Sequence, residues 1–477
     1  MTKARRVLVI GAGLSGLASA ARLLDLAPHT HVEVWESSER AGGWIATERV
    51  PTTALGLSHD PAAELVVDLG PESILRDKPA AWALVQRLGL EDRVVRTRSD
   101  RHGAYVVSRG ALARIPDGFS LIGPGDLMGF ARSDVISLEG KARAAIEMGM
   151  AARSRARDED ESLASFVRRR FGWEVLERLA QPLASGIYGA DPEVLGMLAT
   201  VPRFLEMEAA HGSVTRALVA AARKKKDEEG SGARYGLFFS FDGGMQVLTD
   251  ALAARVASSL RFGRTAGALR RAEHGGFEVT DGEGSSEHFD AVVIALAAHR
   301  VGRLIAELDP HARHALEEIP HGSAATITFA WRRGDVPHAL DAYGFVVPHV
   351  ERRRILASTW SSEKWPGRAP LDLALIRVFA GGEDACARRD DALLAIEARR
   401  ELADLMGITA PPLLQKVMRY ARAMPIQGPD HLARRDAIAQ RLESIPDLAV
   451  AGNSLFGVGI PDSIASGERA AERVSAG

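Results

Sequence analysis

The sequence has a single cysteine, Cys386, among its 477 residues. One thiol excludes an intrachain disulfide and any metal or iron–sulfur site built from several cysteines, and it fits a reducing compartment. The 14 histidines are scattered without the spacing of a metal-binding motif, so we expect surface or structural histidines and no metal site. The chemistry of this chain must therefore come from other groups.

Long apolar runs and an excess of one charge are also absent. The apolar run 7–10 meets a glycine too soon for a signal peptide, and no window approaches the roughly 18 apolar residues that a membrane-spanning helix needs. Lys and Arg number 60 against 62 Asp and Glu, a formal net charge of -2, so there is no general positive field to hold nucleic acid. We expect a globular, cytoplasmic protein of two or three domains, with any membrane contact limited to its surface.

The N-terminal residues have the pattern of a strand, a glycine turn, a helix and a second strand. Residues 7–10 form a β-branched and aliphatic run typical of a strand buried on both faces, and residues 17–26 show helical spacing of apolar residues. A second strand follows at 32–35. Because parallel strands need a crossover helix between them, these residues predict a βαβ unit.

The remaining segments predict an α/β fold class with inserted regions. Further strands are expected at 260–262, 277–280, 289–296 and 448–451, an antiparallel sheet within 322–380, helices through 117–222, and a solvated linker at 223–232. The predicted architecture is a discontinuous Rossmann-like nucleotide-binding domain (1–75, 235–300 and 430–477), an α+β substrate-binding domain (76–116 and 300–430) and a helical insertion (117–234).

Three glycines of the first turn, Gly11, Gly13 and Gly16, match the G-x-G-x-x-G pattern in the strand-to-helix context that gives it meaning. Gly11 permits the tight turn, Gly13 lets the backbone approach a pyrophosphate, and Gly16 lets the helix pack on the strand, while N–H groups at the helix start face the negative charge. Glu36 ends the second strand, where a carboxylate accepts hydrogen bonds from ribose hydroxyls and repels a 2′-phosphate. These residues predict FAD or NAD rather than NADP.

The residues after Glu36 distinguish FAD from NAD. Residues 36–44, ESSERAGGW, resemble the E-x-x-x-R-x-G-G continuation found in the amine oxidase and protoporphyrinogen oxidase superfamily of flavoproteins. In that family the arginine and the paired glycines follow the cofactor outward from the ribose, so the resemblance implies FAD. Many monoamine oxidases attach flavin through a cysteine near the C-terminus, whereas Cys386 lies well before Gly452. We therefore expect FAD to be bound without a covalent link.

Two later segments resemble the same family. Residues 70–73, GPES, are similar to its turn beside the flavin, and residues 452–464 are similar to the loop and helix start that close over the isoalloxazine. A helix N-terminus aimed at the N1–C2=O edge would stabilise reduced flavin by about 1 kcal/mol. The residues assigned to the cofactor are Gly11, Ala12, Gly13, Ser15, Gly16, Glu36, Ser37, Arg40, Gly42, Gly43, Trp44, Gly70, Pro71, Glu72, Ser73, Thr265, Ala295, Gly452, Asn453, Val458, Gly459, Ile460 and Ser463.

The middle of the chain resembles protoporphyrinogen oxidase in particular, through the segments 181–192, 201–208, 211–213 and 239–248. The resemblance implies oxidation of protoporphyrinogen IX to protoporphyrin IX in haem biosynthesis, with O₂ reoxidising FAD and hydrogen peroxide as product. It also implies that the Gly186 carbonyl faces the reacting carbon and that Val346, Leu356 and Phe379 sandwich the macrocycle. Each of these three apolar residues also fits ordinary sheet core.

One departure from the family concerns the substrate. Several members carry a propionate-binding arginine at the position of Ala104, and Arg101, Arg109 and Arg114 are the candidates to replace it. Related enzymes that oxidise coproporphyrinogen III, which has four propionates, can lack this arginine. Oxidation of coproporphyrinogen III to coproporphyrin III therefore stays open as an alternative.

Two further hypotheses are an amine oxidase-like flavoenzyme and a non-enzymatic, flavin-containing porphyrin carrier. The sequence also leaves open a peripheral contact of the helical region with the cytoplasmic face of a membrane, a homodimer, and hand-over of product to a ferrochelatase.

Overall fold

Five strands from distant parts of the chain form one parallel sheet in the computed structural model, which describes residues 4–57, 62–153, 159–228, 238–381 and 389–476. The strand order is β10-β2-β1-β14-β20. The bounds are β1 Arg6–Ile10, β2 His31–Trp35, β10 Leu260–Arg261, β14 Ala291–Ile294 and β20 Leu448–Val450. The sheet thus joins the N-terminal βαβ unit to the middle and the end of the chain.

Alternate side chains of the central strand enter two different cores. Val7 and Val9 belong to one core, and Leu8 and Ile10 belong to another on the opposite face. The helices of the first core are α1 Leu14–Leu26, α2 Pro79–Arg87, α11 Gln246–Arg255 and α19 Ile460–Ser475. The second face carries α12 Ala298–Leu304, α13 Pro310–Glu317, α17 His431–Glu443 and the antiparallel strands β11 Ala266–Arg271, β12 Phe277–Asp281 and β13 Ser286–Phe289. Because both faces are covered, every residue of β1 after Arg6 can be apolar.

A seven-stranded sheet forms a second centre, in the order β19-β15-β18-β17-β16-β7-β8. Its strands are β7 Tyr105–Ser108, β8 Ala111–Arg114, β15 His321–Arg332, β16 Gly344–Val346, β17 Ala357–Trp360, β18 Leu373–Gly381 and β19 Leu414–Pro425. Neighbouring strands are antiparallel except β16 and β7, which are parallel. The antiparallel sheet expected within 322–380 is therefore present, and strands from both sides of that range extend it.

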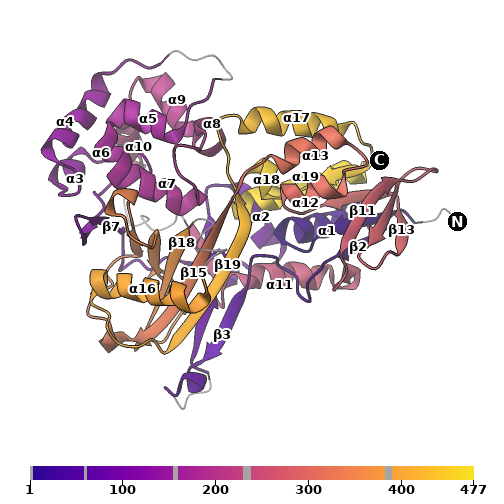
Figure 1. Cartoon of the computed structure of the whole chain (residues 1–477), viewed down its shortest axis with the longest axis horizontal. Helices are drawn as coiled ribbons and strands as arrows, with labels where there is room; N and C mark the ends of the chain where they lie inside the picture. The colour runs from indigo at the N-terminus through magenta and orange to yellow at the C-terminus, as the bar shows by residue number, and fades with distance from the viewer. Residues whose placement is uncertain (1–3, 58–61, 154–158, 229–237, 382–388, 477) are drawn as a thin grey trace.

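Between β8 and the strand β9 (Phe238–Phe241) the chain forms a helical lobe, drawn in purple and magenta in Figure 1. Its helices are α3 Leu127–Arg132, α4 Leu138–Ala145, α5 Leu163–Phe171, α6 Trp173–Val175, α7 Gln181–Tyr188, α8 Met197–Thr200, α9 Pro202–His211 and α10 Val214–Glu228, with a π-helical turn at Leu176–Ala180. The linker expected from residue 223 is wrong over 223–228, because α10 continues through these residues; 229–232 lie outside the described ranges.

The two faces of the seven-stranded sheet meet different surroundings. Ile327 and Val378 point into a core covered by α16 (Asp391–Met406), on one side of the sheet. Their sequence neighbours Thr326 and Phe379 therefore point to the other side, where Figure 1 shows α7. This second face lies between the helical lobe and the parallel sheet, and so borders the region where the predicted site residues gather.

Two of the predicted domain boundaries fall next to helices that pack on the parallel sheet. Leu84 and Val85 of α2 are buried in the first core, and Val301 of α12 and Leu316 of α13 are buried in the second. We therefore propose that the nucleotide-binding region extends past residue 76 through α2, and past residue 300 through α13. The single strand expected at 289–296 is two strands, because Asp290 turns away between them to accept a hydrogen bond from the backbone N–H of Arg6 (2.6 Å).

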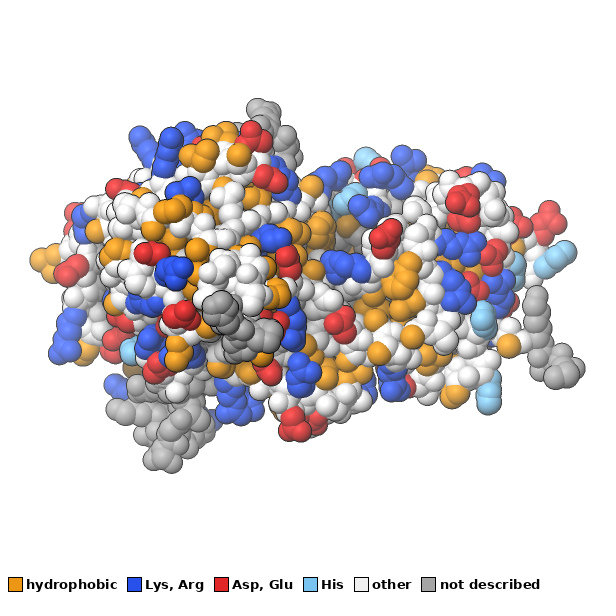
Figure 2. All heavy atoms as spheres, turned by 90° about the horizontal axis from the view of Figure 1, so that it is seen from below, with side chains coloured by type: hydrophobic (Ala, Val, Ile, Leu, Met, Phe, Trp, Pro, Cys, Tyr) orange, Lys and Arg blue, Asp and Glu red, His pale blue; other side chains and the backbone are white. Residues whose placement is uncertain are grey.

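The surface carries both signs of charge. Figure 2 shows acidic and basic side chains interspersed over one face, as the near-zero net charge leads one to expect. Within the described part of the chain, no helix combines the length and the apolar character needed to cross a membrane.

A buried ion cluster holds the helical lobe together. Arg170 and Glu147 are both fully buried, and Arg170 Nε donates to Glu147 Oε1 (3.1 Å) while Nη2 donates to the carbonyl of Gly212 (2.7 Å). Glu147 Oε2 also accepts from Ser213 Oγ (2.7 Å), and Glu208 lies 3.4 Å from Arg170 Nη1. Glu208, Gly212 and Ser213, which carry part of the family resemblance, therefore have a structural role here.

We predict that Arg170→Ala destabilises the protein by about 3–5 kcal/mol, because it leaves the Glu147 carboxylate buried without its cation. Arg168→Ala on the same helix is the matched control, since the ion pair of Arg168 with Glu193 is exposed and such pairs contribute about 0–1 kcal/mol. Urea unfolding followed by circular dichroism measures both variants. Equal losses in the two variants would contradict the assignment of the cluster.

Candidate cofactor and substrate site

The predicted cofactor residues meet at one edge of the parallel sheet. Ile10 of β1 is paired with Trp35 of β2 and with Ile294 of β14, and Ile294 is paired with Val450 of β20. Since the strands are parallel, the residues that follow them emerge side by side at their carboxyl ends. These are Gly11, Glu36, Ala295 and the segment Ala451-Gly452. This edge is where open parallel sheets bind ligands.

The three glycines of the first turn have different surroundings. Gly11 has φ +100°, and a Cβ added there would lie 2.7 Å from the carbonyl oxygen of Ala295. A Cβ at Gly16 would lie 1.9 Å from the carbonyl oxygen of Gly11, so α1 can approach the turn only without a side chain. A Cβ at Gly13 would meet no atom within 4 Å. The backbone of Gly13 therefore borders open space, as a pyrophosphate requires.

The start of α1 leaves donors available beside that space. Gly13 is its N-cap, no side chain caps the first N–H groups, and the first turn contains no acidic residue. Unsatisfied N–H groups at a helix N-terminus bind anions. Ser15 of this turn is buried. The backbone of Ala12 is engaged within the protein, because its N–H donates to Glu36 Oε2 (2.8 Å) and its carbonyl accepts from the N–H of Gly42 (2.8 Å).

Glu36 is held in a fixed orientation at the end of β2. Besides the bond from Ala12, its Oε1 accepts hydrogen bonds from the N–H (2.9 Å) and the hydroxyl (2.8 Å) of Ser38, and lies 3.4 Å from the hydroxyl of Ser37. The side chain is half-buried, and a carboxylate has lone pairs beyond those used here. It can therefore accept from ribose hydroxyls, the role predicted for it.

The loop after β2 packs on the glycine turn. A Cβ at Gly43 would lie 3.1 Å from the Cα of Gly13, so the two backbones are in contact. Arg40 shapes this loop: Nη1 donates to the carbonyls of Ala41 (3.0 Å) and Ile45 (3.1 Å), and Nη2 donates to that of Gly43 (2.5 Å). In the structure the guanidinium thus positions the loop that borders the cofactor space.

Trp44 and Tyr420 extend the same border towards β19. Trp44 is 52% exposed, and its ring meets that of Tyr420 edge to face at a centroid distance of 5.4 Å. The hydroxyl of Tyr420 is buried and has no hydrogen-bond partner among the described residues. A buried, unsatisfied hydroxyl is costly, and a bound group beside Trp44 can supply its partner. The open space at Gly13 and this hydroxyl both fit a long cofactor that runs from the turn to the second sheet.

The turn at residues 70–73 is tied to the seven-stranded sheet by buried charges. A Cβ at Gly70 would lie 1.8 Å from the carbonyl oxygen of Trp44, so this turn packs directly on the preceding loop. Arg377 of β18 is buried and donates from Nη1 to the carbonyl of Gly70 (2.6 Å) and from Nη2 to that of Leu69 (3.2 Å). Sequence reasoning missed Arg377, although a lone charge inside the apolar strand 373–378 marks it.

Glu72 of this turn is an ionised carboxylate in a buried setting. It accepts hydrogen bonds from Lys364 Nζ (2.8 Å) and Ser361 Oγ (3.0 Å). Burial raises the pKa of Glu72, but the positive charges of Lys364 and Arg377 outweigh it and lower the pKa to about 2. Pro71 beside it is exposed and Ser73 is half-buried, so only part of the predicted turn faces outward.

The C-terminal segment returns to the same edge. Gly452 has φ +130°, and Asn453 Nδ2 donates to the carbonyl of Ala423 (3.3 Å). α19 begins at Ile460, and a Cβ at its Gly467 would lie 2.2 Å from the carbonyl oxygen of Ser15, so α19 lies against α1. Gly467 was not predicted, because no pattern in the residues around it indicates a contact with α1. Val458, Gly459 and Ser463 are half-buried at the start of this helix, and Thr265 is exposed in the loop that follows β10.

The predicted substrate residues Val346, Leu356 and Phe379 lie together on the inner face of the seven-stranded sheet, and the fourth predicted residue, Gly186, lies on α7. Val346 is paired with Ala357, which is paired with Phe379. Leu356 precedes Ala357, donates its N–H to the carbonyl of Phe379 (2.7 Å) and accepts at its own carbonyl from Val347 (2.8 Å). A Cβ at Gly186 on α7 would meet only Val346 Cγ1, at 4.0 Å. Gly186 and Val346 therefore border open space between α7 and the sheet.

Arg101, Arg109 and Arg114 were the candidates to replace the propionate-binding arginine that is absent at Ala104. All three already have other partners. Arg101 forms an ion pair with Glu363 (3.1 Å). Arg114 forms an ion pair with Asp341, and its guanidinium lies over the ring of Tyr105. Arg109 donates from Nη1 to the carbonyl of Asp134 (2.8 Å). None of these guanidinium groups is free to receive a substrate carboxylate without giving up an interaction.

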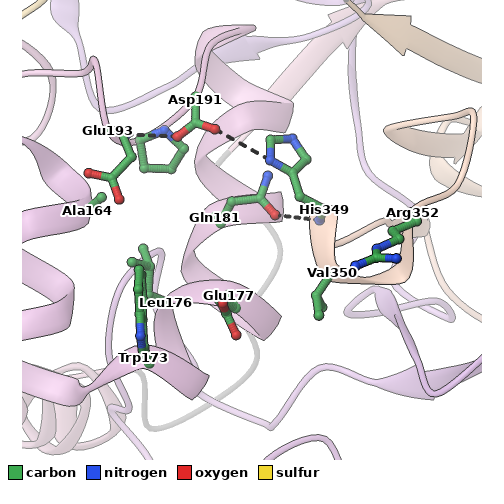
Figure 3. Close-up of a pocket in the computed structure, with 11 residues that line it drawn as sticks. Ala164, Trp173, Leu176, Glu177, Gln181, Asp191, Glu193, His349, Val350 and Arg352 are labelled. Atoms are coloured by element: carbon green, nitrogen blue, oxygen red, sulfur yellow. Dashed lines mark hydrogen bonds and ion pairs between the residues drawn. The ribbon is translucent and has the colours of Figure 1, made fainter.

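A cavity of about 600 Å³ lies elsewhere, between the helical lobe and the segment that follows β16 (Figure 3). Its lining residues are Ala164, Trp173, Leu176, Glu177, Gln181, Asp191, Pro192, Glu193, His349, Val350 and Arg352. His349 Nδ1 faces Asp191 Oδ2 at 3.4 Å and lowers the pKa of that carboxyl. The cavity adjoins the first residue of α7, more than one helical turn from Gly186. Its acidic side chains outnumber its basic ones, which disfavours an anionic ligand.

A metal centre is not indicated by the described residues, which contain no group of three or more His, Cys, Asp or Glu side chains placed to hold an ion. Cys386 lies outside the described ranges.

Comparisons with known proteins show what this chain is similar to. The family model of flavin-containing amine oxidoreductases matches residues 14–475. Coproporphyrinogen III oxidase of Staphylococcus aureus is 31% identical over 100% of both chains, that of Bacillus subtilis is 28% identical over 98% of this chain and 97% of its own, and mitochondrial protoporphyrinogen oxidase of Nicotiana tabacum is 26% identical over 99% and 95%. A solved structure from Exiguobacterium sp. 255-15, provisionally assigned as a protoporphyrinogen oxidase, superposes with a TM-score of 0.85 at 25% identity over 100% of both chains. Wild-type putrescine oxidase, at 17% identity and a TM-score of 0.66, shares the fold.

We predict that two glycine substitutions in the first turn cause different defects, one in FAD content and one in stability. Gly13 has an extended backbone (φ -69°, ψ 176°) and free space around it, so Gly13→Leu should fold normally but fill the cofactor space and lose FAD. Gly16→Ala should instead destabilise the apoprotein, because its Cβ overlaps the carbonyl of Gly11. Flavin absorbance per mole of protein and thermal unfolding of the apoprotein separate the two. Wild-type FAD content in Gly13→Leu would overturn the site.

We also predict a pH-dependent contribution of Glu72. Its pKa of about 2 lies below the ordinary value of 4.5, so the contribution is complete above pH 4.5 and is lost as the pH falls towards 2. Glu72→Gln should therefore be less stable than wild type at neutral pH, with a difference that shrinks on acidification. Urea midpoints between pH 6 and 3 measure it, with Glu91→Gln, an exposed carboxylate, as control. A difference independent of pH would refute the assignment.

Proposed function

Since the chain belongs to the family of flavin-containing amine oxidoreductases, we propose that this FAD-dependent oxidoreductase oxidises coproporphyrinogen III to coproporphyrin III in haem biosynthesis. The observation that carries this proposal is identity of 26–31% over nearly the whole chain to proteins named porphyrinogen oxidases, together with the glycine turn and inner sheet face described above. The cofactor, when bound, supplies the two-electron acceptor, and O₂ is its proposed oxidant, with hydrogen peroxide as product.

The choice of substrate within this reaction class rests on two observations. The first relatives named above are coproporphyrinogen III oxidases, with identities of 31% and 28%. Ala104 also stands where several protoporphyrinogen oxidases have a propionate-binding arginine, and Arg101 and Arg114 are already paired. Protoporphyrinogen IX, favoured by the sequence motifs alone, remains the second candidate, supported by the 26% identity to the tobacco enzyme.

The protein groups around the proposed substrate site bind and orient rather than transfer protons. Val346, Leu356 and Phe379 offer apolar contacts to a flat macrocycle, and the bare backbone at Gly186 lets it approach α7. Arg377 and Glu72 hold the turn beside the flavin through buried bonds. Such a site excludes water and fixes the reacting carbon against the cofactor, which is the protein's contribution when the cofactor carries the chemistry.

We predict that purified protein with bound FAD converts coproporphyrinogen III to a fluorescent porphyrin faster than it converts protoporphyrinogen IX, with matching O₂ consumption. A higher rate on protoporphyrinogen IX would replace the proposed substrate with the second candidate. Fluorescence no faster than autoxidation on both substrates would refute porphyrinogen oxidation.

The same samples separate the remaining hypotheses. Peroxide formed from amines alone would identify an amine oxidase, a class to which the putrescine oxidase structure lends only the fold. A porphyrin carrier would bind porphyrin without any anaerobic bleaching of its flavin by porphyrinogen. Acid precipitation should release the flavin, as expected for FAD that is not covalently attached.

A further inference from the structure

Arg203 is a cation without a partner at the start of α9. Its side chain is exposed, its guanidinium carbon lies 4.7 Å from the centroid of the Phe204 ring, and within the described residues it makes no hydrogen bond or ion pair. Many other arginines of this chain pair with acids, including Arg168 and Arg169 in the same lobe. The charge of Arg203 is therefore available to an anion from outside the protein.

The position of Arg203 connects it to the end of α7. Tyr188, two residues after Gly186, donates its hydroxyl to the carbonyl of Thr200 (2.9 Å), and Thr200 lies three residues before Arg203. Burial raises the pKa of Tyr188 to about 12, with Arg203 lowering it and Asp462 raising it. The hydrogen bond between Tyr188 and Thr200 holds the end of α7 against the residues that lead into α9.

Asp462, the acid that acts on Tyr188 from the start of α19, has a partner of its own. Asp462 is already paired with Lys78, whose Nζ lies 2.6 Å from its carboxylate. The end of α7 also reaches the seven-stranded sheet, because a Cβ at Gly189 would lie 3.6 Å from Met424 Cγ of β19. Arg203 therefore begins α9 beside the end of the helix that carries Gly186, where that helix reaches the sheet.

We infer that Arg203 binds a propionate carboxylate of the substrate and contributes to its selection. The inference rests on the proposed function and names the residue that supplies the cation absent at Ala104. A planar guanidinium binds a carboxylate through two parallel hydrogen bonds, and propionates extend from the edge of the macrocycle. With the ring against the apolar face, a carboxylate at the edge meets a cation at the rim. A substrate with four propionates offers more ways to make this contact than one with two.

The test compares Arg203→Gln and Arg203→Lys with wild-type holoenzyme. Arg132→Gln serves as a control with the same loss of charge, because Arg132 is exposed on α3 of the same lobe. Binding of the product coproporphyrin III is measured by fluorescence titration, and KM and kcat are measured with coproporphyrinogen III. We expect Arg203→Gln to weaken porphyrin binding and raise KM by about fivefold to tenfold, as for one charge-assisted contact near solvent, with kcat nearly unchanged. Arg203→Lys should restore part of the loss, and Arg132→Gln should match wild type.

The binding readout separates this inference from the proposed function. If Arg203→Gln binds coproporphyrin III within twofold of wild type, or if Arg132→Gln loses as much, the inference is overturned even when turnover supports the proposed function. If wild type does not turn over porphyrinogens but Arg203→Gln binds the porphyrin more weakly, the proposed function fails and the carboxylate site stands. Unchanged flavin content and melting temperature show that the variants are folded.

Discussion

Direct contact between backbones at the carboxyl edge of the parallel sheet is the constraint on which the rest of the structure depends. α1 lies against the first turn at Gly16 and against α19 at Gly467, and at both places a Cβ would fall within about 2 Å of a carbonyl oxygen. Because α1 is confined on both sides, its N-terminus, Glu36 and the loop at Gly43 keep one relative position. The predicted cofactor site at this edge therefore relies on missing side chains as much as on those present.

Buried charged groups fix the position of the parallel sheet relative to the seven-stranded sheet. Arg377 belongs to one sheet and donates to the carbonyls of Leu69 and Gly70, and Gly70 packs on the carbonyl of Trp44 in the loop that follows β2 of the other sheet. Glu72 and Lys364 complete the set, so the cation is compensated without access to water. Such a cluster adds little net stability compared with apolar packing, but it accepts only one geometry. The residues predicted for the flavin and for the substrate thus keep one fixed relation.

Features with a local cause could be predicted from the sequence, and features with a distant cause could not. The glycine turn, Glu36 and the strands of the parallel sheet depend on neighbours in sequence, so pattern and resemblance located them. The roles of Gly467 and Arg377 depend on contacts with residues far away along the chain, so the neighbouring sequence could not indicate them. Arg40 was predicted to bind the cofactor, and its bonds to the carbonyls of Ala41 and Gly43 depend on the folded shape of the loop, which no sequence pattern indicates. The helix through 223–228 shows the reverse error, because a charged run can be helical when the preceding residues are packed.

The order of strands in the parallel sheet has a consequence for the nascent chain. β1 and β2 are synthesised first, but β20 and α19 follow every other element of that sheet, and α19 covers α1. Until they emerge from the ribosome, one face of α1 and the outer edge of β14 have no permanent neighbour. Contacts that span nearly the whole chain form slowly, because the intervening loop must close first. The predicted cofactor site is thereby complete only after α19 has been synthesised.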